Sequence, residues 1–154
     1  MGVQLILADE GYEITTDPSR IDVRAVHRYL SEESYWAKNI PFEVVQRSID
    51  HSMCFAVLHN AALAGFARII SDRATYAYLG DVFVLPAHRG KGLSKWLIEH
   101  IKNHPELQGL RRWALATADA HSLYAQFGFT PLKAPGRWME QHFPDVYALL
   151  GSKG

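Results

Sequence analysis

The chain has 154 residues, 48% of them hydrophobic, and its 16 basic and 16 acidic residues give a formal net charge of zero. A chain of this length is expected to fold as one domain over residues 1–154 and to bury roughly two-thirds of its unfolded surface. The balanced charge gives no indication of a surface for polyanions, so nucleic acid is not an expected partner.

Cys54 is the single cysteine, which excludes an intrachain disulfide. It lies in the apolar run 53–58, where we expect a buried structural thiol. No apolar stretch approaches the roughly 18 residues of a membrane span, and the first residues lack a basic region followed by an apolar core. We therefore expect a cytoplasmic protein without a membrane partner.

The first half of the chain predicts a strand, two helices and a strand hairpin. Residues 12–16 alternate between apolar and polar side chains, as a half-buried strand does. Two helices follow, the second beginning near Pro41. The apolar runs 54–58 and 63–70, joined by a short turn, predict two antiparallel strands. The residues expected on the buried helix faces are Val26, Tyr29 and Leu30 in the first helix, and Val44, Val45, Ser48 and Ile49 in the second.

The second half predicts a strand–helix–strand unit, which makes a parallel pair of strands. The expected elements are a long strand 74–85, a helix 93–103, a buried strand 111–116, a helix 119–127 and a final strand pair 129–133 and 137–141. The whole order predicts an α/β (α+β) fold, with a mixed, twisted sheet of about six to seven strands flanked by about four helices.

The segment Arg89-Gly90-Lys91-Gly92-Leu93-Ser94 joins the long strand to an amphipathic helix. A turn at a helix start leaves several backbone N–H groups unpaired at the positive end of the helix dipole. Gly90 and Gly92 permit close approach to the backbone, and Arg89 and Lys91 add positive charge. This composition indicates a phosphate or pyrophosphate ligand; the alternative is an ordinary glycine turn that caps a helix.

Two common phosphate motifs do not fit this segment. A P-loop needs four residues between its first Gly and a closing Gly-Lys-Ser/Thr, and a dinucleotide fingerprint needs a third Gly where this chain has Lys95. The segment instead fits the pattern Arg/Gln-x-x-Gly-x-Gly/Ala through Arg89 and Gly92, with Ser94 in place of the last small residue. Further along, the segment 123–129 fits Leu-Tyr-x-x-x-Gly-Phe.

These two motifs, in this order, resemble those of the GNAT N-acetyltransferase superfamily over roughly residues 55–132. The resemblance implies that the loop Arg89, Gly90, Lys91, Gly92, Leu93 and Ser94 binds acyl-coenzyme A. It implies that the backbones of Phe83 and Val84 receive the pantetheine arm on a strand that bulges and splays from its neighbour; the alternative is ordinary strand pairing. Thr117 stands where the superfamily often has a cofactor-contacting Asn, and Asp119 is expected to cap the following helix.

Tyr124 is the candidate general acid, because the resemblance places the matching tyrosine near the sulfur of coenzyme A. A phenol with a pKa of about 10 is protonated at neutral pH and can donate to a leaving thiolate. The alternative is a packing role for the ring beside Leu123 and Phe127.

Asp81 is the candidate base that removes a proton from the acceptor amine. Strand alternation predicts its side chain on the face opposite Tyr76 and Tyr78. A carboxylate in so apolar a strand needs a partner or a purpose. The alternative is a structural aspartate paired with Arg68.

Tyr35, Trp36 and Arg68 are the candidate acceptor-binding residues. Tyr35 and Trp36 lie between the first two helices, where they form either a wall of the acceptor pocket or part of the core. Arg68 either binds an acceptor carboxylate or pairs with Asp81. No metal site is expected, because His100 and His104 lack a third ligand.

The resemblance implies an acetyl-coenzyme A-dependent N-acetyltransferase that acts on a primary amine by direct transfer in a ternary complex. A small-molecule acceptor is expected, with peptide N-termini and lysine side chains left open. The alternative is a non-catalytic acyl-coenzyme A-binding sensor, suggested by the departures at Ser94 and Thr117. The apolar stretch 146–150 is either a contact in a homodimer or a docked tail.

Overall fold

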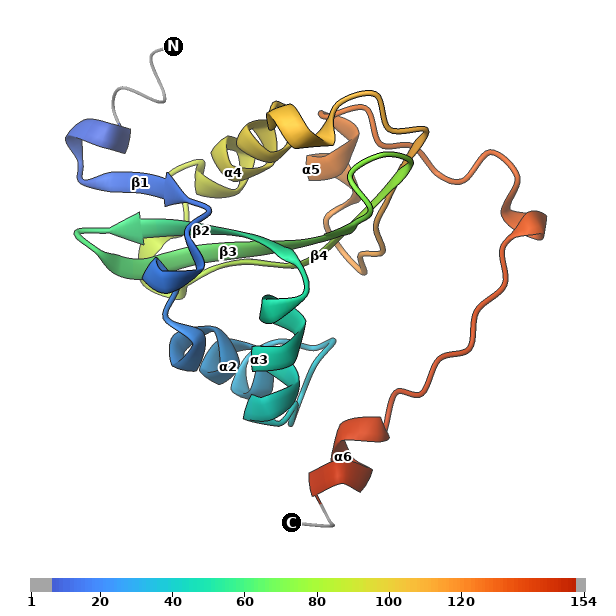
Figure 1. Ribbon diagram of the computed structural model, residues 1–154, viewed down its shortest axis with the longest axis horizontal. Coiled ribbons are helices and arrows are strands. Elements are labelled where there is room, and N and C mark those ends of the chain that lie inside the picture. The colour runs from blue at the N-terminus through green and yellow to red at the C-terminus, as the bar shows by residue number, and fades with distance from the viewer. Residues whose placement is uncertain (1–6, 152–154) are drawn as a thin grey trace.

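The computed structural model describes residues 7–151, which form a five-stranded mixed sheet with helices on both faces (Figure 1). The strands lie side by side in chain order: β1 (Tyr12–Thr15), β2 (Met53–His59), β3 (Ala62–Ser71), β4 (Tyr76–Val84) and β5 (Arg112–Ala114). The first four pair antiparallel, and β5 runs parallel to β4. The expected mixed sheet, with its strand hairpin and its parallel pair, is confirmed.

Two helices cover each face of the sheet (Figure 1). On one face are α2 (Val23–Glu32) and α3 (Phe42–Asp50), on the other α4 (Leu93–Lys102) and α5 (His121–Ala125), and α6 (Val146–Gly151) follows at the end of the chain. Residues 7–9 are also helical. Single 3₁₀ turns, each beginning at a proline, are Pro18–Arg20, Pro86–His88, Pro105–Leu107 and Pro135–Arg137. Proline suits a helix start because its missing N–H would be unpaired there anyway.

The core consists of two apolar clusters, one on each face of the sheet. Phe55 and Ile69 pack toward Leu97 and the rest of α4, whereas Phe66 and its neighbours pack toward α2 and α3. The expected buried faces are confirmed in part: Val26, Tyr29 and Leu30 of α2 and Val45 and Ile49 of α3 are buried, while Val44 and Ser48 are half-buried.

Cys54 is buried, as expected, and its Sγ lies 3.8 Å from the carbonyl oxygen of Ile49. Burial raises the pKa of this thiol to about 12. The thiol is therefore protonated at neutral pH and cannot act as a nucleophile.

The C-terminal part of the sheet differs from the expectation. The strands expected at 129–133 and 137–141 are absent, so the described sheet has five strands rather than six or seven. The strand expected at 111–116 is reduced to β5, whose Arg112 is exposed, and α5 has five residues of the expected 119–127. A strand needs a partner for its backbone groups, and neither segment pairs with another strand among residues 7–151. After the 3₁₀ turn Pro135–Arg137 the chain leaves the sheet as an extended segment (Figure 1).

A bulge in β4 changes the face on which Asp81 lies. Arg68 of β3 pairs with Gly80 and Phe66 pairs with Phe83, so two residues of β4 oppose the single residue Ala67. Asp81 has a φ of 53°, in the left-handed region. The bulge moves the later side chains by one position, and Asp81 points to the α2–α3 side. The predicted alternation was therefore wrong, because a period of two assumes an uninterrupted ladder.

Within residues 7–151, none of the helices is both long enough and apolar enough to cross a membrane.

Candidate active site

The glycine loop presents a row of unpaired backbone N–H groups. Gly90 and Gly92 have φ values of 82° and 81°, a left-handed conformation that favours glycine. Among the described residues, the N–H groups of residues 90–95 have no hydrogen-bond partner; the first N–H that bonds back to the loop is that of Trp96, to Gly92 O at 3.1 Å. These groups stand at the positive end of the ten-residue helix α4. The loop therefore has the geometry of an anion site.

A groove of about 300 Å³ runs from this loop past the end of β4 to α5. It brings together predicted residues from three separate segments. Its lining consists of Val82, Phe83, Val84, His88, Arg89, Gly90, Gly92, Leu93, Ser94, Ala120, Leu123 and Tyr124. A molecule with a diphosphate at one end and a reactive group at the other can therefore contact the loop and Tyr124 together.

Strands β4 and β5 separate beside this groove, as the family resemblance implied. Their pairing ends at Tyr78 and Ala114, so the later part of β4 has a free edge on that side. On its other side, Leu85 N–H donates to Ala64 O at 2.8 Å. Because polar groups alternate along a strand, Phe83 turns its N–H and C=O toward β3, and Val82 and Val84 turn theirs toward the groove. The geometry thus favours Val82 over the predicted Phe83 as a backbone ligand.

The two cations of the loop are engaged with other protein groups. The Arg89 guanidinium donates to Val84 O at 2.9 Å and to the Tyr29 hydroxyl at 3.1 Å. Lys91 Nζ lies 3.8 Å from a carboxylate oxygen of Glu10, and its side chain does not line the groove. Arg89 therefore fixes the end of β4 against α2, and the unpaired N–H groups are left as the free hydrogen-bond donors of the loop.

Tyr124 lies on α5, buried, with an exposed fraction of 8%. Its pKa is raised to about 12, mainly by burial and further by the charges of Tyr35 and Asp119. Its hydroxyl forms no hydrogen bond to another described residue. Every fully buried polar side-chain atom of residues 7–151 has a hydrogen-bond partner, so this hydroxyl is not fully buried. The Tyr124 hydroxyl therefore stays protonated and is accessible from the groove as a donor.

Thr117 lies just before α5 and stabilises the turn that leads into this helix, although α5 has no side-chain cap of its own. Its Oγ1 accepts from Ala120 N–H at 3.1 Å and from Asp119 N–H at 3.4 Å. The expectation that Asp119 is the cap was wrong: Ala120 is the first flanking residue, and the hydroxyl three residues earlier satisfies its N–H. Thr117 lies outside the groove lining but retains its hydroxyl proton as a donor.

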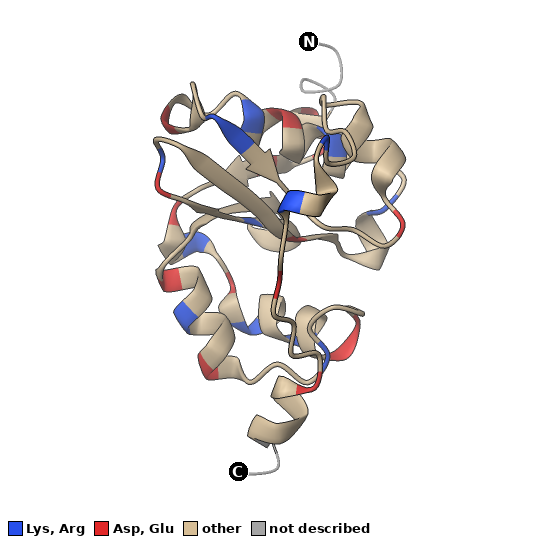
Figure 2. Cartoon of the chain, turned by 90° about the vertical axis from the view of Figure 1, so that its right-hand side faces the viewer, with Lys and Arg blue, Asp and Glu red and all other residues tan. Residues whose placement is uncertain are grey.

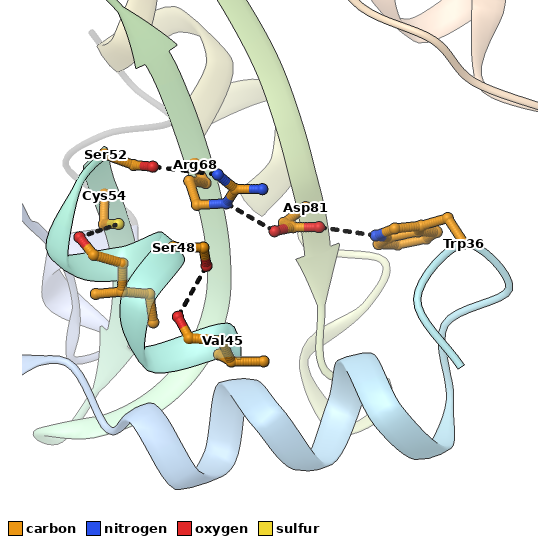
Figure 3. A network of polar contacts seen from close by, with 8 residues as sticks. Trp36, Val45, Ser48, Ser52, Cys54, Arg68 and Asp81 are labelled. Carbon is orange, nitrogen blue, oxygen red and sulfur yellow. Dashed lines mark hydrogen bonds and ion pairs between the residues drawn. The ribbon is translucent and has the colours of Figure 1, made fainter. Parts of the chain in front are cut away.

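A polar network joins Asp81 to two of the predicted acceptor-binding residues (Figure 3). Arg68 Nε donates to one carboxylate oxygen of Asp81 at 2.8 Å, and Trp36 Nε1 donates to the other at 2.9 Å. Arg68 also donates to Ser52 Oγ at 3.1 Å. The side chains of Arg68 and Asp81 are only 18% and 12% exposed. Of the two roles considered for Arg68, pairing with Asp81 is the one present.

Tyr35 connects this network to the groove. Its ring lies edge-on to Trp36 with centroids 5.0 Å apart, and its hydroxyl accepts from Ala118 N–H at 2.9 Å, just before α5. Tyr35 is 59% exposed and Trp36 is 40% exposed. These values exclude core packing and agree with an exposed wall between Asp81 and Tyr124.

The sequence analysis missed His88, which lines the groove at the start of the glycine loop. Its Nδ1 is 2.7 Å from the Tyr12 hydroxyl, and its ring centroid is 5.2 Å from that of His59. Burial, followed by the charges of His59 and Lys91, lowers the pKa of His88. The sequence offered one indication that His88 belongs to the site, namely its position directly before the glycine loop.

Acidification should destabilise the protein through His88. Because the folded state lowers the pKa of this imidazole below the ordinary value of about 6.5, the unfolded state binds more protons between these two values. The free energy of unfolding should rise with pH through that window and level off above it. Melting temperatures measured between about pH 5.5 and 7.5 should show this slope. His88→Asn, which retains an acceptor for Tyr12, should reduce this slope, and His100, whose pKa is also lowered by burial, should account for the remainder.

The matched control for this measurement is the variant His51→Asn, because His51 is exposed and is the C-cap residue of α3. The control should keep the slope of the parent protein. An unchanged slope in His88→Asn would assign the pH dependence to other groups.

Comparison with known proteins agrees with this geometry. A model of the acetyltransferase (GNAT) family matches residues 23–129. A protein of Gibberella zeae named "Putative acetyltransferase FG08082" is 28% identical over 137 residues, which cover 75% of this chain and 76% of that protein.

Solved structures give the same result. A protein from Xanthomonas campestris pv. campestris, described as a "putative acetyltransferase belonging to the gnat family", is 53% identical, with a TM-score of 0.88 over 89% of this chain and 96% of that one. A Clostridium acetobutylicum structure, described as a "predicted acetyltransferase with acetyl-CoA", is 17% identical and shares the fold, with a TM-score of 0.62 over 85% and 94% of the two chains. With the family match spanning well over half of its length, this chain belongs to the GNAT acetyltransferase family.

Proposed function

We propose that this protein transfers the acetyl group of acetyl-coenzyme A to a primary amine, by direct attack within a ternary complex. One observation carries the proposal: the row of unpaired N–H groups at residues 90–95 and the Tyr124 hydroxyl open into the same groove. The first feature suits a diphosphate, and the second suits a leaving thiolate.

The residues of the groove fit acetyl-coenzyme A in three parts. The N–H groups of residues 90–95 and the α4 dipole would bind the diphosphate. A Cβ on Gly90 or Gly92 would meet no protein atom within 4 Å, so the space over the loop is open to a ligand. The backbone N–H and C=O of Val82 and the N–H of Val84, whose carbonyl already accepts from Arg89, would bind the pantetheine amides. When bound, the thioester supplies an acyl group activated for transfer.

The chemistry requires few protein groups. A neutral amine attacks the thioester carbon, the C–N bond forms, the C–S bond breaks, and the carbonyl oxygen carries negative charge in between. A backbone N–H of β4 would stabilise that oxygen, and Tyr124 would donate its proton to the departing sulfur. Cys54, the single cysteine, is buried and protonated, so the proposal needs no acyl-enzyme step.

The acceptor would bind beside Tyr35, Trp36 and Asp81. The Asp81 carboxylate, held by the hydrogen bonds from Arg68 and Trp36, would attract a cationic amine. Each carboxylate oxygen accepts one hydrogen bond and keeps a further lone pair. Asp81 therefore has the capacity to bind the amine and to accept its proton, directly or through water. The balanced charge of the chain gives no indication of a surface for a highly charged macromolecule, which favours a small-molecule acceptor.

The proposal is tested with acetyl-coenzyme A and a panel of primary amines, including small molecules, peptide N-termini and lysine peptides. Acetylated amine is measured by mass spectrometry and free thiol by absorbance. Turnover with at least one amine is the expected result. Tight coenzyme A binding without turnover on any class of amine would instead favour a non-catalytic sensor of acyl-coenzyme A.

Asp81→Asn should slow transfer most at low pH, where more of the amine is protonated and a base matters most. The measurement is the pH profile of kcat/KM with the confirmed acceptor. Asp50→Asn is the matched control, since its Oδ1 accepts from Gln46 at 3.0 Å and an asparagine retains that acceptor. A profile that runs parallel to that of the parent would give Asp81 a structural role as the partner of Arg68 and Trp36.

A further inference from the structure

The C-terminal arm, residues 130–150, exposes most of the large apolar side chains found on the surface of the described chain. Met139 is 96% exposed and Phe143 is 65% exposed, and Leu132, Trp138, Val146 and Leu150 are between 38% and 46% exposed. Between the 3₁₀ turn Pro135–Arg137 and α6 the arm is an extended segment (Figure 1), and Tyr147 of α6 packs against the apolar cluster of α2 and α3. Apolar surface of this extent on one segment marks an interface.

A second feature matches the arm. Strand β5 is the last strand of the sheet, and its outer edge has no partner among residues 7–151. Along it runs a groove of about 800 Å³, formed by β5, the end of α4 and the first residues of the arm. The aromatic rings of Trp113, Phe129 and Trp138 line this groove. An open strand edge beside an apolar groove is a template for an added strand.

The charges of the groove and the arm are complementary. The groove is lined by Lys102, Arg111, Arg112, Lys133 and Arg137, and by no acidic residue. Residues 138–150 carry Glu140 and Asp145 and no lysine or arginine. Figure 2 faces the side of the molecule that carries the arm and shows acidic and basic residues interspersed over it. The outer arm therefore suits the groove in charge as well as in apolar character.

We infer that the partner of this surface is a second copy of the chain. Residues 139–145 of one copy bind the β5 groove of the other, and the two-fold axis repeats the contact. Each chain carries both an arm and a groove. When two copies exchange their arms, each arm fills the groove of the other copy, and the assembly is closed. The strand predicted at 137–141 then forms on the partner's sheet edge instead of on its own.

Light scattering after size exclusion tests this directly on the full chain. The expected mass is twice the 17.4 kDa of one chain. Removal of residues 139–154 should give a monomer, as should the double variant Met139→Lys/Phe143→Lys, which brings positive charge to a basic groove. Ile70→Lys is the matched control, because Ile70 is 47% exposed on β3 and does not line the groove, and this variant should remain a dimer.

The double variant should weaken the dimer by at least about 30-fold in dissociation constant, as expected when buried apolar anchors are lost. The inference would be overturned if the parent protein were monomeric at about 100 μM, because this concentration is far above the dissociation constant of a stable dimer. A truncated chain that remains dimeric would overturn it too, because the contact would lie elsewhere. Hydrogen exchange of the parent does not depend on any variant folding: residues 139–145 should be protected at high concentration and unprotected on dilution. Equal exchange at both concentrations would contradict the proposal.

Discussion

Tyr124→Phe should lower the maximal rate of acetyl transfer by about 10²–10⁴-fold, the usual contribution of a general acid, while leaving coenzyme A affinity nearly unchanged. The substitution removes one hydroxyl and keeps the ring, so the packing of α5 should survive. Burial raises the pKa of this hydroxyl to about 12, so the proton is present throughout the neutral range. The hydroxyl bonds to no other described residue, so its removal leaves no protein group unpaired.

The loss should appear in kcat and kcat/KM together, because the hydroxyl would act in the transition state. Turnover with a confirmed amine, in parent and variant of equal melting temperature, is the measurement. Tyr76→Phe, a half-buried tyrosine on β4, is the matched control and should change little. A change below about threefold, well outside the range of general acid catalysis, would mean that Tyr124 is a packing residue and the thiolate leaves unassisted.

Gly92→Val should abolish coenzyme A binding, with a loss of at least about 100-fold, as expected when two charge-assisted hydrogen bonds are lost. In the protein itself, a Cβ at residue 92 would meet no atom within 4 Å. A valine side chain would therefore occupy space that is open in the free protein and that the diphosphate would fill. Calorimetric titration with coenzyme A measures the effect.

A control is needed because valine is also strained at a φ of 81°. Gly109 has a φ of 73° and is exposed, and a Cβ added there would likewise meet no atom within 4 Å. Gly109→Val carries a comparable strain of about 1–2 kcal/mol but lies outside the groove. It should lose stability to a similar degree and keep its affinity. Unchanged affinity in Gly92→Val would move the diphosphate away from the loop.

The sequence by itself predicted the parts of the site that depend on local structure. The glycine loop, the start of α4 and the position of Tyr124 on α5 follow from residues close together in the chain. Left-handed φ values at Gly90 and Gly92, unpaired N–H groups in a first helical turn, and a buried helix face are all set within a few residues. The buried faces of α2 and α3 were predicted for the same reason.

Only the tertiary structure decided the surroundings of Asp81 and the end of the sheet. The bulge that turns Asp81 toward Arg68 and Trp36 exists because β4 pairs with β3, and periodicity within β4 cannot reveal a change in register between two strands. The strands expected after α5 have the right composition but no partner within their own chain. Strand hydrogen bonds join residues distant in sequence, so a pattern predicts that a segment can form a strand, and the fold determines whether a neighbouring edge is there to pair with it.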